Sequence, residues 1–378
     1  MRICVSALLV TTQPGMKLAG VGRHMFAVLN QLTITNLGHQ YDVFIRDDLD
    51  MPETWNQCRW ITWHRLSITN SRQRIWWEHF NIGSEARKLK ADIVFSLFLS
   101  LPAFCRIPMV AVAHDAFPRT HADWYPPRKR LILDQLTALA CKKSKALITV
   151  SEFSKRELSR AYKIDSAKIF VAPNGLGNDI RILSSDDLKL VDMNNFHATR
   201  YIFSVGTIEP RKNLDGLIRG FELVKRNPEM KDVKLLIAGA KGWLDSSVGK
   251  TWEQSAVKED IEFLGYVSDL ELNALMQNAK VFALTSFVEG FGIPPLEAMT
   301  VGTPVVCSNT SALPEVCGDF AFYCDPSSVE SIGGALTEAL TNEQQRAHNI
   351  EGGLERSEEF SWHESVKKLE IAFQFAVN

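Results

Sequence analysis

The chain has 378 residues, 46% hydrophobic and 23% charged, with a formal net charge of −2. This length exceeds one ordinary core, so two domains are expected, and the composition excludes a disordered or fibrous protein. The seven cysteines form no C-x-x-C pair, which argues against a zinc site or disulfide framework and for free thiols in a reducing compartment.

The charge is unevenly distributed. Residues 1–180 hold 24 Lys and Arg against 15 Asp and Glu, whereas residues 181–378 hold 18 against 29. Two interpretations stay open: chance composition of two solvated surfaces, or an N-terminal half that meets an anionic partner such as lipid phosphate.

The N-terminus begins with the apolar run MRICVSALLV. This run breaks at Thr11 without a small-residue cleavage pattern, so we interpret it as a buried first strand rather than a secretion signal. No apolar run approaches the ~20 residues that a membrane-spanning helix needs.

Short β-branched apolar runs recur along the chain, and helical patterns lie between most of them. We expect six strands in each half, on either side of a polar gap at residues 179–200. Buried strands that alternate with helices predict an α/β protein of two doubly wound domains with a cleft between them. The expected strands are 2–8, 41–46, 91–97, 108–115, 146–152 and 168–175, then 200–207, 234–240, 261–267, 280–286, 303–309 and 320–326.

In such sheets ligands bind outside the carboxyl ends of the strands. After the first strand, Gly20 and Gly22 precede a helical pattern and would let backbone N–H groups approach an anion. The full G-x-G-x-x-G pattern is absent, since residue 25 is Met. His114 follows the fourth expected strand, where an imidazole can bond a sugar hydroxyl, act as acid or base, or be a satisfied loop residue.

Two adjacent cations follow the first strand of the second half. Gly206 and Thr207 end that strand, and Arg211 and Lys212 precede a helical pattern. Positive charge at a helix N-terminus opposes the helix dipole, so we infer an anionic ligand there. A diphosphate fits, because Arg grips it bidentately and Lys adds a mobile charge.

The segment FVEGFGIPPLEAM at 287–299 places two carboxylates in an apolar stretch, where they are costly unless paired. Glu297 falls in the first turns of a helix that begins at the two prolines, where it can take both hydroxyls of a ribose. Glu289 lies on a glycine-containing loop and is expected to bond the hydroxyls of a sugar. With the cation pair, these residues predict a nucleotide-sugar site.

These motifs closely resemble those of the family 4 retaining glycosyltransferases, which have the GT-B fold of two Rossmann-like domains. The donor pattern reads EGFGIPPLEAM-x-x-GTPVV at 289–306, and the phosphate pattern reads GTIEPRKN at 206–213. VSEFSKREL, VAPNG and RIWWEH in the first half are also similar to this family. The family pattern often has Tyr where this chain has His24, and we infer no mechanistic role from this difference.

The resemblance implies a role for each matching residue. Arg211 and Lys212 would stabilise the departing nucleotide, and His114 would contact the sugar near its reacting carbon. The implied catalytic residues are His114, Arg211, Lys212 and Glu289. The implied binding residues are Gly22, Gly206, Thr207, Arg211 and Lys212 for phosphate; His114, Glu289, Gly290, Phe291, Gly292 and Ile293 for the sugar; Glu297 for ribose; and Tyr266 and Val267 for the base.

The resemblance further implies a retaining hexosyltransferase of polysaccharide biosynthesis that needs neither cofactor nor metal. Its donor would be UDP-glucose-type, which is slightly favoured, or GDP-mannose, and its acceptor a glycan or lipid-linked oligosaccharide. Residues 1–185 would bind acceptor and 186–357 donor, and a helix at 358–378 would cross back to the first domain. A nucleotide-sugar epimerase or phosphorylase of the same fold and a non-catalytic sugar-binding protein are the alternatives. No pyridoxal lysine context supports the phosphorylase.

Two other segments carry weaker signals. Asp48-Leu49-Asp50 matches the D-x-D metal motif of the other major transferase fold, but its polar surroundings indicate a solvated loop. SRQRIWWEHF at 71–80 mixes two Arg with Trp76 and Trp77. It is either an interfacial patch that touches a membrane or lipid-linked glycan, or a core element of the family. The expected location is the cytoplasm, with peripheral contact to its membrane face if the first interpretation holds.

Overall fold

The computed structural model describes residues 1–10, 20–177, 180–191, 200–240 and 246–378, which form two compact units. Unit 1 comprises residues 1–122, 127–175 and 361–378, and unit 2 comprises residues 123–126 and 176–360. Parts of the expected polar gap, 179 and 192–199, lie outside the described residues. The domain boundaries expected at 185 and 357 stay predictions.

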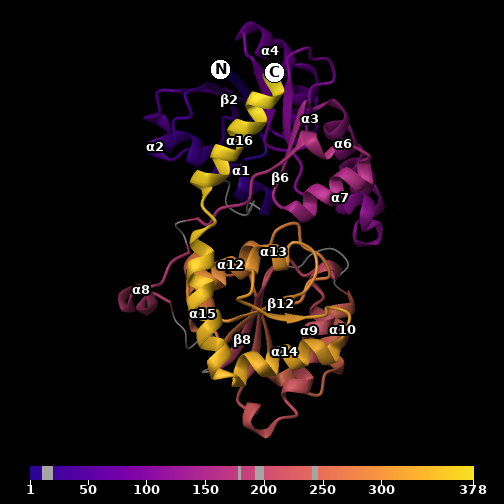
Figure 1. Cartoon of the computed structure of the whole chain (residues 1–378), viewed down its shortest axis with the longest axis vertical. Coiled ribbons are helices and arrows are strands. Elements are labelled where there is room, and N and C mark those ends of the chain that lie inside the picture. The colour runs from indigo at the N-terminus through magenta and orange to yellow at the C-terminus, as the bar shows by residue number, and fades with distance from the viewer. Residues whose placement is uncertain (11–19, 178–179, 192–199, 241–245) are drawn as a thin grey trace. The chain divides into compact units, whose positions relative to one another are not determined.

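Unit 1 is built on a seven-stranded parallel sheet with the order β3-β2-β1-β4-β5-β6-β7. Figure 1 shows this unit in indigo and magenta, with the C-terminal helix in yellow. Helices α1 and α16 bury apolar side chains against one face of this sheet, and α4, α6 and α7 bury theirs against the other. The strands are β1 (Arg2–Ser6), β2 (Gln40–Arg46), β3 (Ile61–Leu66), β4 (Ile93–Ser96), β5 (Met109–Val112), β6 (Ala146–Thr149) and β7 (Ile169–Val171). The helices are α1 (Gly20–Ile34), α2 (Glu53–Asn56), α3 (Ser71–Phe80), α4 (Ile82–Lys88), α5 (Phe117–Thr120), α6 (Pro127–Lys143), α7 (Glu152–Tyr162) and α16 (Trp362–Val377).

Unit 2 repeats this plan with a six-stranded parallel sheet in the order β10-β9-β8-β11-β12-β13. Its amphipathic helices α9 and α14 pack against each other and against the sheet. The strands are β8 (Tyr201–Val205), β9 (Lys234–Ala238), β10 (Ile261–Gly265), β11 (Val281–Leu284), β12 (Val305–Ser308) and β13 (Phe322–Cys324). The helices are α8 (Ser185–Lys189), α9 (Leu214–Val224), α10 (Ser246–Gln254), α11 (Asp269–Asn278), α12 (Ile293–Thr300), α13 (Leu313–Cys317), α14 (Val329–Thr341) and α15 (Glu343–Glu358).

The predicted α/β architecture of two doubly wound units with parallel sheets is confirmed. All twelve expected strands occur, and β3 is an additional strand that the sequence analysis missed. β3 pairs only with β2, at the edge of its sheet. Its residues are mostly half-buried or exposed, so its sequence ITWHRL lacks the continuous apolar run by which the other strands were recognised.

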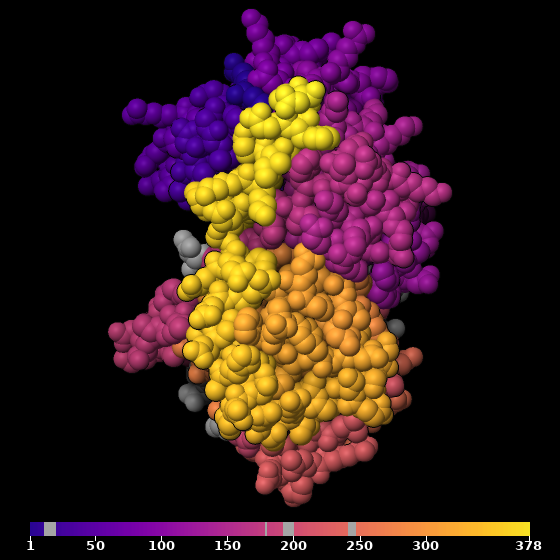
Figure 2. Space-filling view, in the orientation of Figure 1, coloured from indigo at the N-terminus to yellow at the C-terminus, as the bar shows by residue number. Residues whose placement is uncertain are grey.

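The C-terminal helix α16 packs on the sheet of unit 1. In Figure 2 it lies as a yellow rod between the indigo and magenta parts of that unit. The ring of Phe373 lies 5.0 Å from that of Phe95. At its N-terminal end the backbone of Trp362 is so close to Gly175 that a Cβ there would lie 2.1 Å from the Trp362 nitrogen. Close packing therefore demands glycine at residue 175.

All seven cysteines are free thiols, as the sequence predicts. Of the helices in the described part of the chain, none combines the length and apolarity needed to cross a membrane.

Candidate active site

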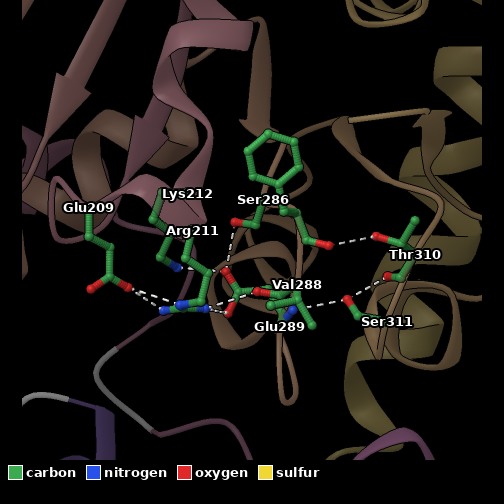
Figure 3. Close-up of polar contacts among 9 residues, drawn as sticks. Glu209, Arg211, Lys212, Ser286, Val288, Glu289, Thr310 and Ser311 are labelled. Carbon is green, nitrogen blue, oxygen red and sulfur yellow. Dashed lines mark hydrogen bonds and ion pairs between the residues drawn. The ribbon is translucent and has the colours of Figure 1, made fainter. Parts of the chain in front are cut away.

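The carboxylate of Glu289 bridges two cations that come from a different loop (Figure 3). Arg211 and Lys212 lie on a 3-10 turn (Pro210–Lys212) after β8, and Glu289 lies on the loop after the neighbouring strand β11. Lys212 Nζ donates to Glu289 Oε1 at 2.7 Å, and Arg211 Nη1 donates to Oε2 at 2.5 Å. Because neighbouring parallel strands end at the same edge of a sheet, residues 77 apart in sequence meet there.

Two further side chains complete this ion-pair cluster. Arg211 Nε donates to Glu209 Oε1 at 2.9 Å, and Ser286 Oγ donates to Glu289 Oε1 at 2.7 Å. Both glutamates are buried, at 6% and 7% exposure. Two cations thus face two carboxylates, which offsets the cost of burying each charge.

Burial and ion pairing shift the pKa values of the cluster in opposite directions. Burial disfavours the Glu289 carboxylate, but Arg211 and Lys212 outweigh this and lower the pKa of Glu289 to about 2. Burial also opposes the charge on Arg211, yet Glu289 and Glu209 raise its pKa above the ordinary value. At Lys212 burial wins and the pKa is lowered, although Glu289 opposes the shift.

Asn213 holds the cation-bearing turn in place, a role that the sequence analysis did not assign. This residue has a left-handed backbone, with φ of 52°. Its Nδ2 donates to the backbone oxygens of Thr285 and Pro326, at 3.1 and 2.7 Å. Its Oδ1 accepts from the nitrogen of Gly216 at 3.3 Å. One carboxamide therefore ties together the segments that follow β8, β11 and β13.

Two hydroxyl residues of the loop after β12 anchor the Glu289 loop, and the sequence analysis missed both. The backbone nitrogen of Glu289 donates to Ser311 Oγ at 3.0 Å. Thr310 Oγ1 donates to the backbone oxygen of Phe287 at 3.1 Å. Both partners lie more than twenty residues away in sequence, so only the fold brings them together.

Glycines follow three adjacent strands at this edge. Gly206 and Gly239 directly follow β8 and β9, Gly265 is the last residue of β10, and all three have positive φ. Gly239 N donates to the Gly265 oxygen at 2.7 Å, and a Cβ on Gly239 would lie 1.9 Å from the Gly206 oxygen. A Cβ on Gly206 would lie 3.2 Å from Lys212 Cε. The backbone therefore approaches closely beside the ammonium group, and Thr207 next to it is exposed.

The remaining predicted donor residues of unit 2 lie on the same edge. α12 begins after Gly292, whose φ is +115°, with prolines in its first turn as expected. Glu297 is buried on α12, at 6% exposure. Of the predicted sugar-binding residues, Phe291 is buried, and Gly290 and Ile293 are half-buried. Of the predicted base-binding residues after β10, Tyr266 is exposed and Val267 is half-buried. Their roles toward ribose, sugar and base stay predictions.

The predicted residues of unit 1 lie at strand and helix ends. Gly22 is in the first turn of α1, and His114 is the second residue after β5. The ring of His114 stands perpendicular to that of His24, with centroids 4.6 Å apart. Within the described residues, neither Nε2 atom has a hydrogen-bond partner, and both are buried.

The two weaker motifs are also placed. Asp48 lies on the loop after β2, where it forms an ion pair with Arg46. The segment 71–80 is helix α3, and its two tryptophans face different surroundings. Trp77 packs on Phe44, with ring centroids 4.8 Å apart, whereas Trp76 is 59% exposed. The helix is thus partly a core element, and it also presents an aromatic ring to solvent.

The cluster of unit 2 has the chemistry of an anion site. Arg211 and Lys212 carry eight side-chain N–H groups between them. They lie close to a glycine backbone at the strand ends and can hold a diphosphate. No group of three His, Cys, Asp or Glu side chains within the described ranges is arranged to hold a metal ion.

Comparisons with known proteins show what this chain is similar to. Residues 190–356 match the family model "Glycosyl transferases group 1", and residues 18–177 match "Glycosyltransferase Family 4". The chain is 32% identical to the O-antigen chain mannosyltransferase B of Escherichia coli, over 70% of each protein. It is 26% identical to the serotype-specific mannosyltransferase WbdA of Escherichia coli over 67% of this chain, but spans only 32% of that relative. The crystal structure of Anabaena Alr3699/HepE in complex with UDP and glucose has a similar fold, with TM-score 0.71, 16% identity and 99% coverage of both chains.

Proposed function

Because this chain belongs to the family 4 glycosyltransferases of the GT-B fold, we propose that it transfers a hexose from a nucleoside-diphosphate sugar to a glycan, with retention of anomeric configuration. The observation that carries this proposal is the half-buried pair Arg211–Lys212 at the strand ends of unit 2, held by the buried Glu289. The donor diphosphate binds this pair, and the same two cations stabilise the nucleoside diphosphate as it leaves.

The ion-pair cluster explains how Arg211 and Lys212 can remain charged in this site when no ligand is bound. Glu289 compensates them in the free enzyme. When the diphosphate arrives, it shares these donors, and Glu289 keeps their side chains oriented. The sugar then develops positive charge at its reacting carbon, and the acceptor attacks from the face that the phosphate leaves. Charge stabilisation comes from protein groups, so the reaction proceeds without a metal ion.

Mannose is the proposed sugar, because two relatives of this chain are the O-antigen chain mannosyltransferase B and the serotype-specific mannosyltransferase WbdA. GDP-mannose is therefore the first donor to test, and UDP-glucose is the competing donor. Glu297 binds the ribose, and Tyr266 and Val267 border the base. The sugar is contacted by Glu289, residues 290–293 and His114. The acceptor is a growing polysaccharide or a lipid-linked oligosaccharide.

We further propose that the enzyme binds the cytoplasmic face of a membrane. An aromatic patch, defined as Trp76, Phe80 and Phe104, would make this contact. These side chains are 59%, 55% and 84% exposed. The rings of Trp76 and Phe80 lie 5.9 Å apart, and the Ala103 nitrogen bonds the His79 oxygen beside them at 2.8 Å. The exposed cations Arg87 and Arg106 lie near this patch in the chain, a combination that suits an anionic lipid surface.

The deciding assay measures release of nucleoside diphosphate from GDP-mannose and UDP-glucose, with and without a chelator, and determines the anomeric configuration of the product. Release that depends on acceptor, survives chelation and gives a retained anomer supports the proposal. Incubation with donor alone separates the epimerase, because only an epimerase then makes a new nucleotide sugar. Donor binding with no turnover in any condition would point to the non-catalytic alternative.

A further inference from the structure

His24 lies at the centre of a buried cluster in unit 1 that sequence alone did not reveal. It is 2% exposed, and its Nδ1 lies 2.7 Å from Asn174 Oδ1. Its ring meets that of His114 edge to face, with centroids 4.6 Å apart. Trp362, the first residue of α16, lies against another side of His24 at 5.4 Å. Three segments that are distant in sequence thus converge on the imidazole of His24.

The Asn174 contact defines the tautomer of His24. A carboxamide oxygen only accepts hydrogen bonds, so Nδ1 of His24 carries the proton and donates. In the neutral ring Nε2 is then an acceptor. Burial lowers the pKa of His24 to about 4, although the bond to Asn174 opposes this shift. Burial, and then the neighbouring His24, lower the pKa of His114 as well, so both rings are neutral near pH 7.

We propose that His24 is a positioning residue that orients the His114 imidazole, with Asn174 fixing the His24 ring in turn. This inference rests on the proposed contact of His114 with the transferred sugar. A neutral, oriented His114 offers the sugar a hydrogen bond without adding positive charge beside a cation-like transition state.

Two variants separate orientation from packing. His24→Asn keeps a donor for Asn174 but removes the ring from His114; we expect kcat to fall on the order of a hundredfold, as for a misplaced catalytic group, while the KM for donor changes little. The matched control is His39→Asn, a buried histidine of the same unit that bonds Glu370. It leaves kcat unchanged despite a comparable loss of packing.

Asn174→Asp tests the coupling through protonation. A carboxylate at Nδ1 raises the pKa of His24 from about 4, because an opposite charge favours the imidazolium. Of the described side chains that contact His24, His114 is titratable, whereas Asn174 and Trp362 are neutral. We expect kcat of this variant to fall as pH drops through the raised pKa, within a range where the wild-type profile is flat.

Imidazole ¹⁵N chemical shifts of the free enzyme provide a readout that does not depend on turnover. The proposal predicts a protonated Nδ1 on His24, and a shift of the His114 signals in both variants. Unchanged His114 signals together with wild-type kcat in His24→Asn would overturn it. If His114→Ala keeps full activity, the proposed sugar contact has failed instead. That result is distinguishable, because the His114 shifts in His24→Asn and Asn174→Asp still report the coupling.

Discussion

Glu289 Oε1 lies 2.7 Å from Lys212 Nζ, although 77 residues separate the two in sequence. This contact joins the two donor motifs of the chain into one cluster. It also explains why a carboxylate occurs in an apolar loop, since the charge of Glu289 is matched by Lys212 and Arg211.

The first prediction concerns the charge of Glu289. Glu289→Gln leaves Arg211 and Lys212 undercompensated in a buried site, and should lower the free energy of unfolding by about 3 kcal/mol. Chemical denaturation measures this loss, with Glu338→Gln, an exposed residue of α14, as the matched control. An equal effect of both substitutions would show that the cluster does not stabilise the fold.

The ion pairs of Glu289 with Arg211 and Lys212 predict a pH dependence of the free energy of unfolding. The Glu289 pKa is lowered from 4.5 to about 2, so its stabilising contribution is fully present above about pH 4.5 and is lost as pH falls toward 2. As pH falls from 6 toward 2, the free energy of unfolding should therefore decrease more steeply for the wild-type protein than for Glu289→Gln. Parallel denaturation curves at each pH would contradict the assigned ion pairs.

Asn213 gives a prediction that separates backbone strain from hydrogen bonding. Asn213→Gly keeps the left-handed backbone but loses the bonds to Thr285 and Pro326, at a cost of about 1–3 kcal/mol. Asn213→Ala adds about 1 kcal/mol of backbone strain. Both variants should weaken donor binding, because the turn that carries Lys212 loses its anchor. Thermal unfolding and donor affinity measure the two effects; wild-type affinity in both would refute the anchoring role.

Gly239 and Gly265 form a matched pair for testing the glycine-lined edge. A Cβ on Gly239 would lie 1.9 Å from the Gly206 oxygen, whereas a Cβ on Gly265 meets nothing within 4 Å. Both residues have positive φ, so Gly265→Ala reports backbone strain alone, about 1 kcal/mol. Gly239→Ala should cost clearly more and reduce donor affinity. Similar losses in unfolding free energy would mean that close packing at this edge matters little.

The aromatic patch predicts binding to anionic vesicles. Trp76→Ser combined with Phe104→Ser should reduce cosedimentation with phosphatidylglycerol-containing vesicles at least about tenfold, because two exposed rings no longer insert. Leu190→Ser, which alters an apolar residue of unit 2 that is 75% exposed, is the control. Binding that survives the double substitution would remove the patch from the proposal.

The sequence predicted the fold well, because strands buried on both faces appear as continuous apolar runs. Strand β3 was not predicted, because this edge strand carries Trp63, His64 and Arg65 and has no continuous apolar run. The prolines of α12 correctly indicated its start, since proline is favoured in a first helical turn.

The site was predictable only where its residues belong to recognisable motifs. The sequence placed Arg211, Lys212 and Glu289 near a common ligand, but not in direct ion pairs with one another. The anchors Asn213, Thr310 and Ser311, and the contact of His24 with Asn174 150 residues away, depend on which strand ends are neighbours. That information comes from the topology of the sheets and not from any local pattern.

The central claim is that Lys212 and Arg211 hold the donor diphosphate. Calorimetric titration of GDP in the presence of a chelator, into wild type, Lys212→Met and Lys225→Met, tests it most directly. Lys225 pairs with Asp260 outside the cluster and serves as the control. Loss of one charge-assisted contact should weaken GDP binding about 10- to 100-fold in Lys212→Met, with no change in Lys225→Met. Wild-type affinity for GDP in Lys212→Met would contradict the account.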